Sequence, residues 1–326
     1  MGKDFKRILT GIQSTGTPHL GNILGAIIPA IKYSQQDNTE TYLFIADLHS
    51  LTQIKNAKIL NENTLNTAAA WLACGLDPNK TIFYRQSDVP QVTELAWYLS
   101  CLYPFNRLTL AHSFKDKKSR LEDINSGLFN YPILMAADIL LYDAQIVPVG
   151  KDQLQHLEIT RNVANRFHNI YGETFILPKE DLQENNKLIQ GTDGEKMSKS
   201  KNNVINIFAD VKELKKQIKN IKTDSSGLQD RKDWSNCNLF KIYSLIANEN
   251  EICKMKMQYE NGGYGYGNIK EDLFNLINTK FKNERDKFQY YISNPEEVNL
   301  ILSSGAVKAQ STANKVLNRV RKKLGY

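Results

Sequence analysis

The stretch "RILTGIQSTGTPHLGN", residues 7–22, determines the fold from the amino end of the chain. Its first part, "RILTGI" (7–12), is an apolar run of strand length, and a turn rich in Gly, Ser, Thr and Pro follows. The next segment, "GNILGAIIPAIKYSQ" (21–35), places apolar side chains at helical spacing. We expect Pro29 to weaken or kink this helix. A strand, a tight turn and a helix in this order are typical of the first unit of a parallel sheet.

The same alternation continues through the first half of the chain. Further strands are predicted at 41–47, 81–86 and 145–150, and further helices at 61–76, 126–144 and 152–172. Strands and helices that alternate in this way predict a parallel sheet with right-handed crossovers. Because ligands collect at the carboxyl ends of such strands, the functional candidates are the residues that follow Ile12, Ala46 and Val149.

The composition changes beyond residue 200. Lysine, asparagine and glutamate dominate there, and helical patterns are predicted at 210–222, 236–247, 268–292 and 296–323. We therefore predict an α/β protein with a Rossmann-like, nucleotide-binding domain over 1–200 and an all-helical domain over 201–292. Residues 293–326 are expected to form C-terminal helices that pack back on the first domain. The glycine-rich stretch 261–268 is expected to join two helices.

The bulk composition is that of a globular protein of 326 residues with a formal charge of +7. Two domains are the default at this length. The positive charge is compatible with a polyanionic partner without requiring one. The four cysteines form no CxxC pair, so neither a structural zinc site nor a disulfide framework is indicated. The start of the chain lacks the apolar region of a signal peptide, and no apolar run is long enough to span a bilayer, which predicts a cytoplasmic protein without membrane contact.

Two segments could bind phosphate groups. Glycines in "GIQSTGTPHLGN" (11–22) let the backbone approach a ligand, and His19 and Asn22 lie three residues apart at the start of the helix. The segment matches neither GxGxxG nor GxxxxGK[ST], so it could be only a turn. Far downstream, "GTDGEKMSKSKNN" (191–203) is either a solvated basic turn or a phosphate-binding loop, and short lysine runs usually belong to exposed faces.

The two segments together carry a more specific signal. A "PHLGN" turn after the first strand, followed by an intact "KMSKS" at 196–200, resembles the two signatures of class I aminoacyl-tRNA synthetases. Asn22 stands where the first signature usually ends in histidine. Within this class, the chain resembles the tryptophanyl-tRNA synthetase family, bacterial type, over nearly its whole length. The stretches that carry this resemblance are 11–22, 113–119, 131–161, 223–227 and 259–267.

This resemblance implies an enzyme that activates L-tryptophan with ATP, expels pyrophosphate and transfers tryptophan to tRNA(Trp). It also implies Mg²⁺ on the ATP phosphates without a protein-held metal, a symmetric homodimer, a catalytic domain over 1–200 and an anticodon-binding domain over 201–292. No side-chain nucleophile is required, so catalysis should consist of positioning and neutralisation of phosphate charge. The implied catalytic residues are Lys117, Lys196, Lys199, His19 and Asn22.

The implied ATP site extends over several segments. Its residues are Gln13, Ser14, Thr15, His19, Gly21, Asn22, Gly150, Lys151, Asp152, Gln153, Leu188, Ile189, Lys196, Met197, Ser198, Lys199 and Ser200. A carboxylate at the end of a strand, such as Asp152, suits the hydroxyls of a ribose. Asp152 could equally be the N-cap of the following helix, or serve both roles.

Amino-acid selection is expected to depend on Asp138, an acidic residue inside an apolar helix, where an unpaired charge is costly. The resemblance makes it the acceptor for the indole N–H, which can only donate. An internal salt bridge is the alternative, which we disfavour because few cations lie near it in the sequence. The implied tryptophan-binding residues are Asp138, Met135, Tyr131, His49, Leu9, Gln13, Val147 and Val149. Leu9 and Ser113 depart from the family pattern, which often has Phe and Gln there.

Three alternatives stay open from the sequence. A tyrosyl-tRNA synthetase would share the fold and both signatures, but Met135 and Ala136 beside Asp138 favour a bulky apolar ring. A small-molecule adenylyltransferase would generally be shorter, and a non-catalytic RNA-binding protein would not need lysines for pyrophosphate. The basic segments 212–222 and 318–326 are either tRNA contacts or solvated faces, and we favour tRNA contact.

Overall fold

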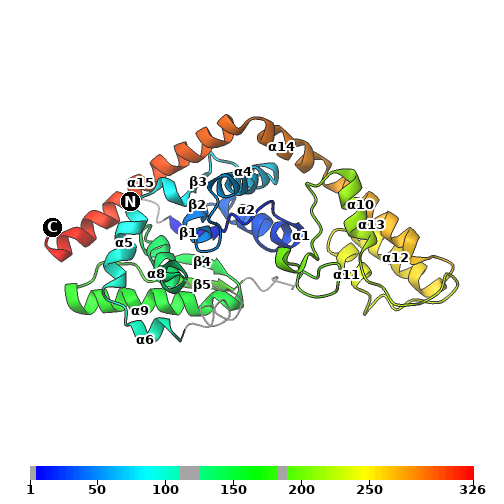
Figure 1. The fold of residues 1–326 in the computed structure, drawn as a ribbon, viewed down its shortest axis with the longest axis horizontal. Helices are drawn as coiled ribbons and strands as arrows, with labels where there is room; N and C mark the ends of the chain where they lie inside the picture. The colour runs from blue at the N-terminus through cyan, green and yellow to red at the C-terminus, as the bar shows by residue number, and fades with distance from the viewer. Residues whose placement is uncertain (1–4, 111–124, 183–188) are drawn as a thin grey trace.

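The computed structural model describes residues 5–110, 125–182 and 189–326, and it is built around a five-stranded parallel sheet (Figure 1). The strands are β1 (Lys6–Ile12), β2 (Thr39–Ile45), β3 (Thr81–Arg85), β4 (Ile146–Val149) and β5 (Lys179–Leu182). The parallel sheet and its first four strands are confirmed. Strand β5 was missed because its four residues, "KEDL", are mostly polar and carry no β-branched side chain.

The strand order is β3-β2-β1-β4-β5, so the chain reverses its direction across the sheet between β1 and β4. It builds outward from β1 to β2 and β3, and then returns to place β4 on the other side of β1. A crevice forms at the carboxyl ends of two such strands because their connections leave in opposite directions. This topology positions the site described below.

Helices cover both faces of the sheet, as a parallel sheet requires. One face carries α5 (Gln91–Ser100), α8 (Ser126–Leu140) and α9 (Leu154–Tyr171), and the other carries α1 (Leu20–Asn22), α2 (Ile28–Ser34) and α4 (Ala57–Ala73). Strand β2 shows the alternation: Tyr42 and Phe44 join the first core, whereas Leu43 and Ile45 join the second. Short elements at the strand ends are α3 (Asp47–Ser50), η2 (Gln86–Asp88) and η3 (Lys151–Gln153), and two further short elements are α6 (Phe105–Leu108) and η4 (Lys199–Lys201).

The helix predicted over 21–35 is present in three pieces. A π-helical turn, η1 (Ile23–Ile27), separates α1 from α2, and Pro29 is the second residue of α2. Proline has no backbone N–H to donate to the preceding turn, and its ring crowds the carbonyl four residues earlier. The wider π turn directly before Pro29 accommodates this defect, which agrees with the expected weakening.

The second half of the described chain is helical. It comprises α10 (Val211–Lys219), α11 (Asn238–Ser244), α12 (Glu249–Asn261), α13 (Tyr266–Lys280), α14 (Lys282–Ser293) and α15 (Pro295–Leu324). Helix α12 was missed because it is mostly polar, and only Met255 and Tyr259 are buried. The joint expected at 261–268 is confirmed, since Gly262 and Gly263 adopt positive φ between α12 and α13. Among the helices that the structure describes, none is long and apolar enough to cross a membrane.

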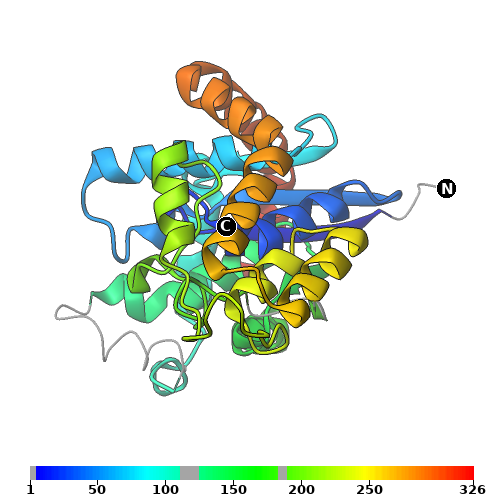
Figure 2. The same cartoon turned by 90° about the vertical axis from the view of Figure 1, so that its right-hand side faces the viewer.

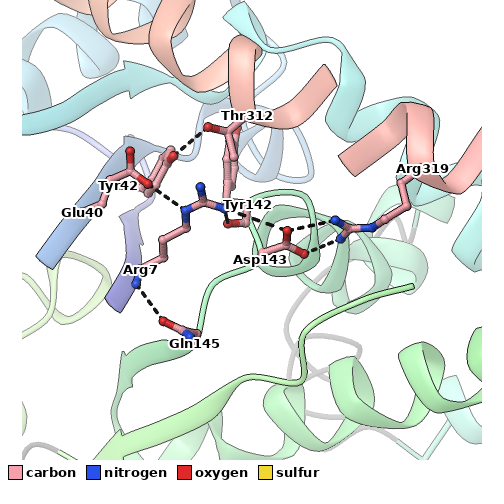
Figure 3. A network of polar contacts seen from close by, with 8 residues as sticks. All are labelled: Arg7, Glu40, Tyr42, Tyr142, Asp143, Gln145, Thr312 and Arg319. Atoms are coloured by element: carbon pink, nitrogen blue, oxygen red, sulfur yellow. Dashed lines mark hydrogen bonds and ion pairs between the residues drawn. The ribbon is translucent and has the colours of Figure 1, made fainter. Parts of the chain in front are cut away.

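Helices α14 and α15 lead from the α10–α13 cluster, which faces the viewer in Figure 2, back to the sheet. Helix α15 packs its backbone directly on β3, where a Cβ on Gly305 would lie 1.8 Å from the Phe83 carbonyl oxygen. Polar contacts hold the same helix further along (Figure 3). Arg319 Nη2 donates to Asp143 Oδ1 at 2.6 Å, and the Tyr42 and Thr312 hydroxyls are 2.9 Å apart.

Candidate active site

A cavity of about 600 Å³ opens at the carboxyl ends of β1 and β4, where the strand order reverses. This volume suits a small-molecule site. The predicted site residues that line the cavity are Leu9, Gln13, Thr15, Asn22, His49, Tyr131, Met135, Asp138, Val147, Val149, Gly150, Gln153 and Lys199. They come from segments far apart in the sequence, and the structure brings them to one place.

The apolar wall of the cavity comes from the strand ends and from α8. Leu9 of β1 is only 2% exposed, and Phe44 of the neighbouring β2 also lines the cavity. A Cβ on Gly11 would come within 2.6 Å of the Phe44 ring, so glycine at this position leaves room for that ring. Phe44 was not predicted as a site residue. It supplies an aromatic ring next to the position where Leu9 stands in place of the expected phenylalanine.

Asp138 lies at the polar end of this wall and is almost fully buried, with 2% of its surface exposed. Its Oδ2 is 3.0 Å from His49 Nε2, and the Gln86 amide nitrogen donates to Oδ1 at 2.8 Å and to Oδ2 at 2.9 Å. Burial raises the pKa of the Asp138 carboxyl, while hydrogen bonds from His49 and Gln86 oppose the rise.

The structure thus gives Asp138 an internal partner in His49, and the two form an ion pair when the histidine is protonated. His49 lies 89 residues away in the sequence, so counting nearby cations could not find it. Gln86 was also missed, although it follows β3 directly and so belongs to the class of positions at which ligands collect. Asp138 nevertheless lines the cavity, together with apolar residues such as Met135 and Val149.

Tyr131 and His156 form a second buried polar pair in the cavity. The Tyr131 hydroxyl is 3.2 Å from His156 Nε2, and the two rings meet edge to face. Tyr131 was predicted, whereas His156 was not. A histidine on the first turns of an amphipathic helix gives no distinct signal, because such a residue is more often part of a polar face.

His19 and Asn22, in the first signature segment, exchange two hydrogen bonds with each other. The His19 Nδ1 accepts from the Asn22 backbone N–H at 3.2 Å, and Asn22 Oδ1 accepts from the His19 backbone N–H at 3.2 Å. This reciprocal capping box fixes the start of α1. Burial, with the nearby Lys199 charge, lowers the pKa of His19 to about 4, so the ring is neutral at physiological pH. Asn22 reaches the cavity, whereas His19 is buried behind it.

The second signature folds onto the first. Lys199 Nζ donates to the Thr15 carbonyl oxygen at 3.1 Å, although much of the lysine side chain is exposed. Removal of water from the ammonium group lowers its pKa to about 8. Gly16 makes this approach possible: its φ is +108°, and a Cβ there would lie 3.2 Å from Lys199 Nζ.

Met197 anchors the signature loop while Lys196 stays free of the core. The Met197 side chain is 4% exposed and packs in the core of the second sheet face, and its sulfur accepts from the Gly21 N–H at 3.3 Å. Lys196 is exposed on the other side of the turn. Along this short stretch the apolar residue is therefore buried and the lysine before it is left accessible to solvent.

Asn203 holds the base of the same loop and was not predicted. It is 2% exposed; its amide nitrogen donates to Asp193 Oδ1 at 2.7 Å and to the Lys196 carbonyl at 3.1 Å. Its amide oxygen accepts from the Ser198 N–H at 2.7 Å. One side chain thus joins three positions of the loop, which gives it a defined shape rather than that of a solvated turn.

The other predicted residues lie around the cavity rather than in its wall. Ser14 is fully buried and bonds to Ser50, so its hydroxyl is engaged within the protein. Lys151 is exposed in η3, Ser198 and Ser200 bond to each other, and Ile189 is half-buried near Gly25.

The N-cap position of α9 is Gln153, one residue after Asp152. The side chain of Asp152 is not described, and Lys117, Leu188 and Ser113 lie outside the described residues.

Comparison with known proteins agrees with this arrangement. The family of class I tRNA synthetases for tryptophan and tyrosine matches residues 3–282. Tryptophan–tRNA ligase from Campylobacter jejuni is 45% identical over 319 residues, which cover 98% of this chain and 99% of the relative. The same enzyme from Rhodopirellula baltica is 46% identical over 319 residues, again covering 98% and 99% of the two chains.

Solved structures give the same result. The crystal structure of tryptophanyl-tRNA synthetase from Campylobacter jejuni complexed with ADP and tryptophan superposes with a TM-score of 0.94 at 44% identity, covering 98% of this chain and 100% of the other. A tyrosyl-tRNA synthetase from Archaeoglobus fulgidus, with a TM-score of 0.65 at 17% identity and coverage of 87% and 90%, shares the fold alone. The chain belongs to the class I tRNA synthetases for tryptophan and tyrosine, and among them to the tryptophan–tRNA ligases.

Proposed function

We propose that the cavity binds L-tryptophan and ATP side by side, joins them as tryptophanyl-adenylate with release of pyrophosphate, and then passes tryptophan to tRNA(Trp). The observation that carries this proposal is the buried Asp138 carboxylate in a largely apolar cavity that also reaches Lys199 of the basic loop. A flat aromatic ligand with one hydrogen-bond donor fits the first feature, and a polyphosphate fits the second. The related Campylobacter jejuni structure holds ADP and tryptophan.

The amino-acid end selects tryptophan through one acceptor. Oδ2 of Asp138 already has two partners, His49 and Gln86, whereas Oδ1 has only the Gln86 amide among the described residues. A carboxylate oxygen can accept two hydrogen bonds, so Oδ1 keeps one acceptor direction for the indole N–H. A site that offers such a buried acceptor rejects ligands that lack the donor by roughly 10⁴-fold, which makes an editing site unnecessary.

The phosphate end neutralises charge. A carboxylate oxygen of tryptophan attacks the α-phosphorus, the bond to the bridging oxygen breaks, and pyrophosphate leaves with its negative charge. In this proposal Lys196 and Lys199 stabilise the leaving group, and Asn22 and the start of α1 meet the remaining phosphate or the ribose. Mg²⁺ would enter with the ATP phosphates and reduce their charge further. Lys117 is proposed to join them from outside the described residues.

The remaining parts of the proposal concern the partner molecules. We assign residues 1–200 to catalysis, 201–292 to anticodon binding, and 293–326 to a C-terminal segment that packs back on the catalytic domain. Two basic segments, 212–222 and 318–326, lie at opposite ends of the molecule in Figure 1. One tRNA can contact both kinds of segment if it bridges two subunits. A homodimer is supported by large apolar side chains left exposed on α5 and α6, Trp97 at 68% and Phe105 at 67%.

Tyrosine is the closest competing amino acid, because tyrosyl-tRNA synthetases share this fold. ATP–pyrophosphate exchange measured with each amino acid separates the two. We expect exchange that depends on tryptophan, followed by attachment of tryptophan to tRNA(Trp). Exchange only with tyrosine would overturn the assignment, and exchange with neither would overturn the proposed activation step.

A further inference from the structure

We propose that Asp47 is a positioning residue for tryptophan selection: by bonding Ser87 it sets the two groups, His49 and Gln86, that orient the Asp138 carboxylate. This inference rests on the proposed function of Asp138 as the indole acceptor. Asp47 lies at the carboxyl end of β2 and Ser87 at that of β3, so the contact joins two neighbouring strand ends.

The contact between these strand ends is a two-point clamp. Asp47 Oδ1 accepts from the Ser87 backbone N–H at 3.0 Å, and Asp47 Oδ2 accepts from the Ser87 hydroxyl at 2.5 Å. Asp47 Oδ1 also accepts from the Leu48 N–H at 3.0 Å. Asp47 is 6% exposed, so these bonds form where a carboxylate has little water to replace them. Hydrogen bonds to a charged acceptor are the stronger kind, and two of them fix both distance and rotation.

Each end of the clamp carries one of the groups that hold Asp138. His49 stands two residues after Asp47 in the single turn of α3, and Gln86 directly precedes Ser87 in η2. Both are buried, at 6% and 1% exposure. Since Gln86 bonds both oxygens of Asp138 and His49 bonds one, their relative placement decides which way the free acceptor direction of Oδ1 points. The Asp47–Ser87 clamp sets that relative placement.

Asp47 does not line the cavity, and it would touch neither tryptophan nor ATP. It is also the first residue of a short helix, where aspartate is favoured for local reasons alone. The two roles differ in their consequences. If the role of Asp47 is purely local, its loss should lower stability and change the KM values for tryptophan and ATP alike. If Asp47 positions the Asp138 carboxylate, its loss should change the KM for tryptophan and leave the KM for ATP nearly unchanged.

The test compares Asp47→Ala, Asp47→Asn and a control, Asp88→Asn, in tryptophan-dependent ATP–pyrophosphate exchange. Asp88 is the neighbouring carboxylate in η2 and pairs with Arg85 at 3.5 Å. We expect Asp47→Ala to raise the KM for tryptophan about tenfold with little change in the KM for ATP. The Asp47→Asn side chain keeps the Oδ1 acceptor and can donate to the Ser87 hydroxyl, so it should restore most of the affinity. Asp88→Asn should behave as wild type.

Discrimination provides a readout that a structural role would not move. L-β-(benzothienyl)alanine has the shape of tryptophan but no ring N–H. The preference for tryptophan over this analogue is the ratio of the two kcat/KM values. We expect this ratio to fall by about the same factor in Asp47→Ala and in Gln86→Ala. The double variant, Asp47→Ala with Gln86→Ala, should show no lower ratio than Gln86→Ala alone.

Three outcomes would overturn the inference: additive effects in the double variant, equal changes in both KM values, or a lowered melting temperature with unchanged KM values. If wild type itself shows no tryptophan-dependent exchange, the proposed function fails instead.

Discussion

The Lys199 ammonium lies 3.1 Å from the Thr15 carbonyl oxygen, a hydrogen bond between residues 184 positions apart that joins the two signature segments. The bond places a partly desolvated ammonium group beside the turn that follows β1, where Lys199 lines the cavity. It also means that ATP binding must compete with, or rearrange, an existing contact of this loop.

The lowered pKa of Lys199, about 8, predicts a pH dependence of ATP use. Below this pH the ammonium is charged and attracts phosphate; above it the amine is neutral and the attraction is lost. We expect kcat/KM for ATP in pyrophosphate exchange to fall as the pH rises through about 8, since this parameter reports groups of the free enzyme. The arginine side chain in Lys199→Arg stays charged over this pH range, so this variant should not show the fall in kcat/KM. If kcat/KM for ATP falls near pH 8 in Lys199→Arg as it does in wild type, the fall belongs to another titrating group.

Lys196→Ala should lower the rate of adenylate formation by roughly 100-fold while changing the affinity for tryptophan little, because the proposed role of Lys196 is to stabilise charge that develops on pyrophosphate. Single-turnover measurement of adenylate formation gives the rate, and equilibrium binding gives the affinity. Lys201→Ala is the matched control, since the Lys201 side chain is exposed and its ion pair with Glu195, at 4.0 Å, is exposed too. Equal rates for Lys196→Ala and wild type would make the loop merely a basic surface.

Asp138→Ala should chiefly destroy selection for tryptophan. With the buried acceptor gone, the preference for tryptophan over an analogue without the ring N–H should collapse from roughly 10⁴-fold toward unity. The ratio of kcat/KM values for the two amino acids measures this change, and the melting temperature checks that the fold survives. A preserved ratio would show that the indole N–H meets another group.

Asn203→Ala should slow activation roughly tenfold without raising the KM for tryptophan, because the loop that carries Lys196 and Ser198 loses its shared side-chain partner. The buried groups left without a partner add a cost of about 1–3 kcal/mol to the closed loop. Asn202→Gly is the control: Asn202 has a φ of +51°, which glycine adopts freely, so activity should persist. A rise in the tryptophan KM of Asn203→Ala would contradict a role confined to the loop.

Gly305→Ala should lower the free energy of unfolding by about 1–3 kcal/mol, since the added methyl group meets the backbone of β3 at Phe83. Denaturant unfolding measures the loss. Gly267→Ala, in α13, adds the same methyl group where no atom lies within 4 Å, and it should leave stability unchanged or raise it by about 0.5–1 kcal/mol. Equal losses of stability in both variants would contradict the explanation by close packing on β3, because only Gly305 of the two meets other atoms at the added methyl group.

Strands, helices and the two signature segments could be predicted from the sequence, because they depend on local properties. The apolar runs of β1 to β4, the helical spacing of 152–172 and the intact 196–200 loop are all readable over short stretches. Elements with weak local patterns, β5 and α12, could not be found in this way, because β5 is mostly polar and α12 buries only Met255 and Tyr259.

The sequence by itself determined a parallel α/β sheet, the cavity at its carboxyl edge and the family to which the signatures point, since periodicity and motif spacing carry that information. Only the tertiary structure decided the partners of buried polar groups. His49 and Gln86 meet Asp138 from 89 and 52 residues away, and Asp47 bonds Ser87 across 40. Such pairs follow from strand order and from the need to satisfy every buried charge, and that need acts through space rather than along the chain.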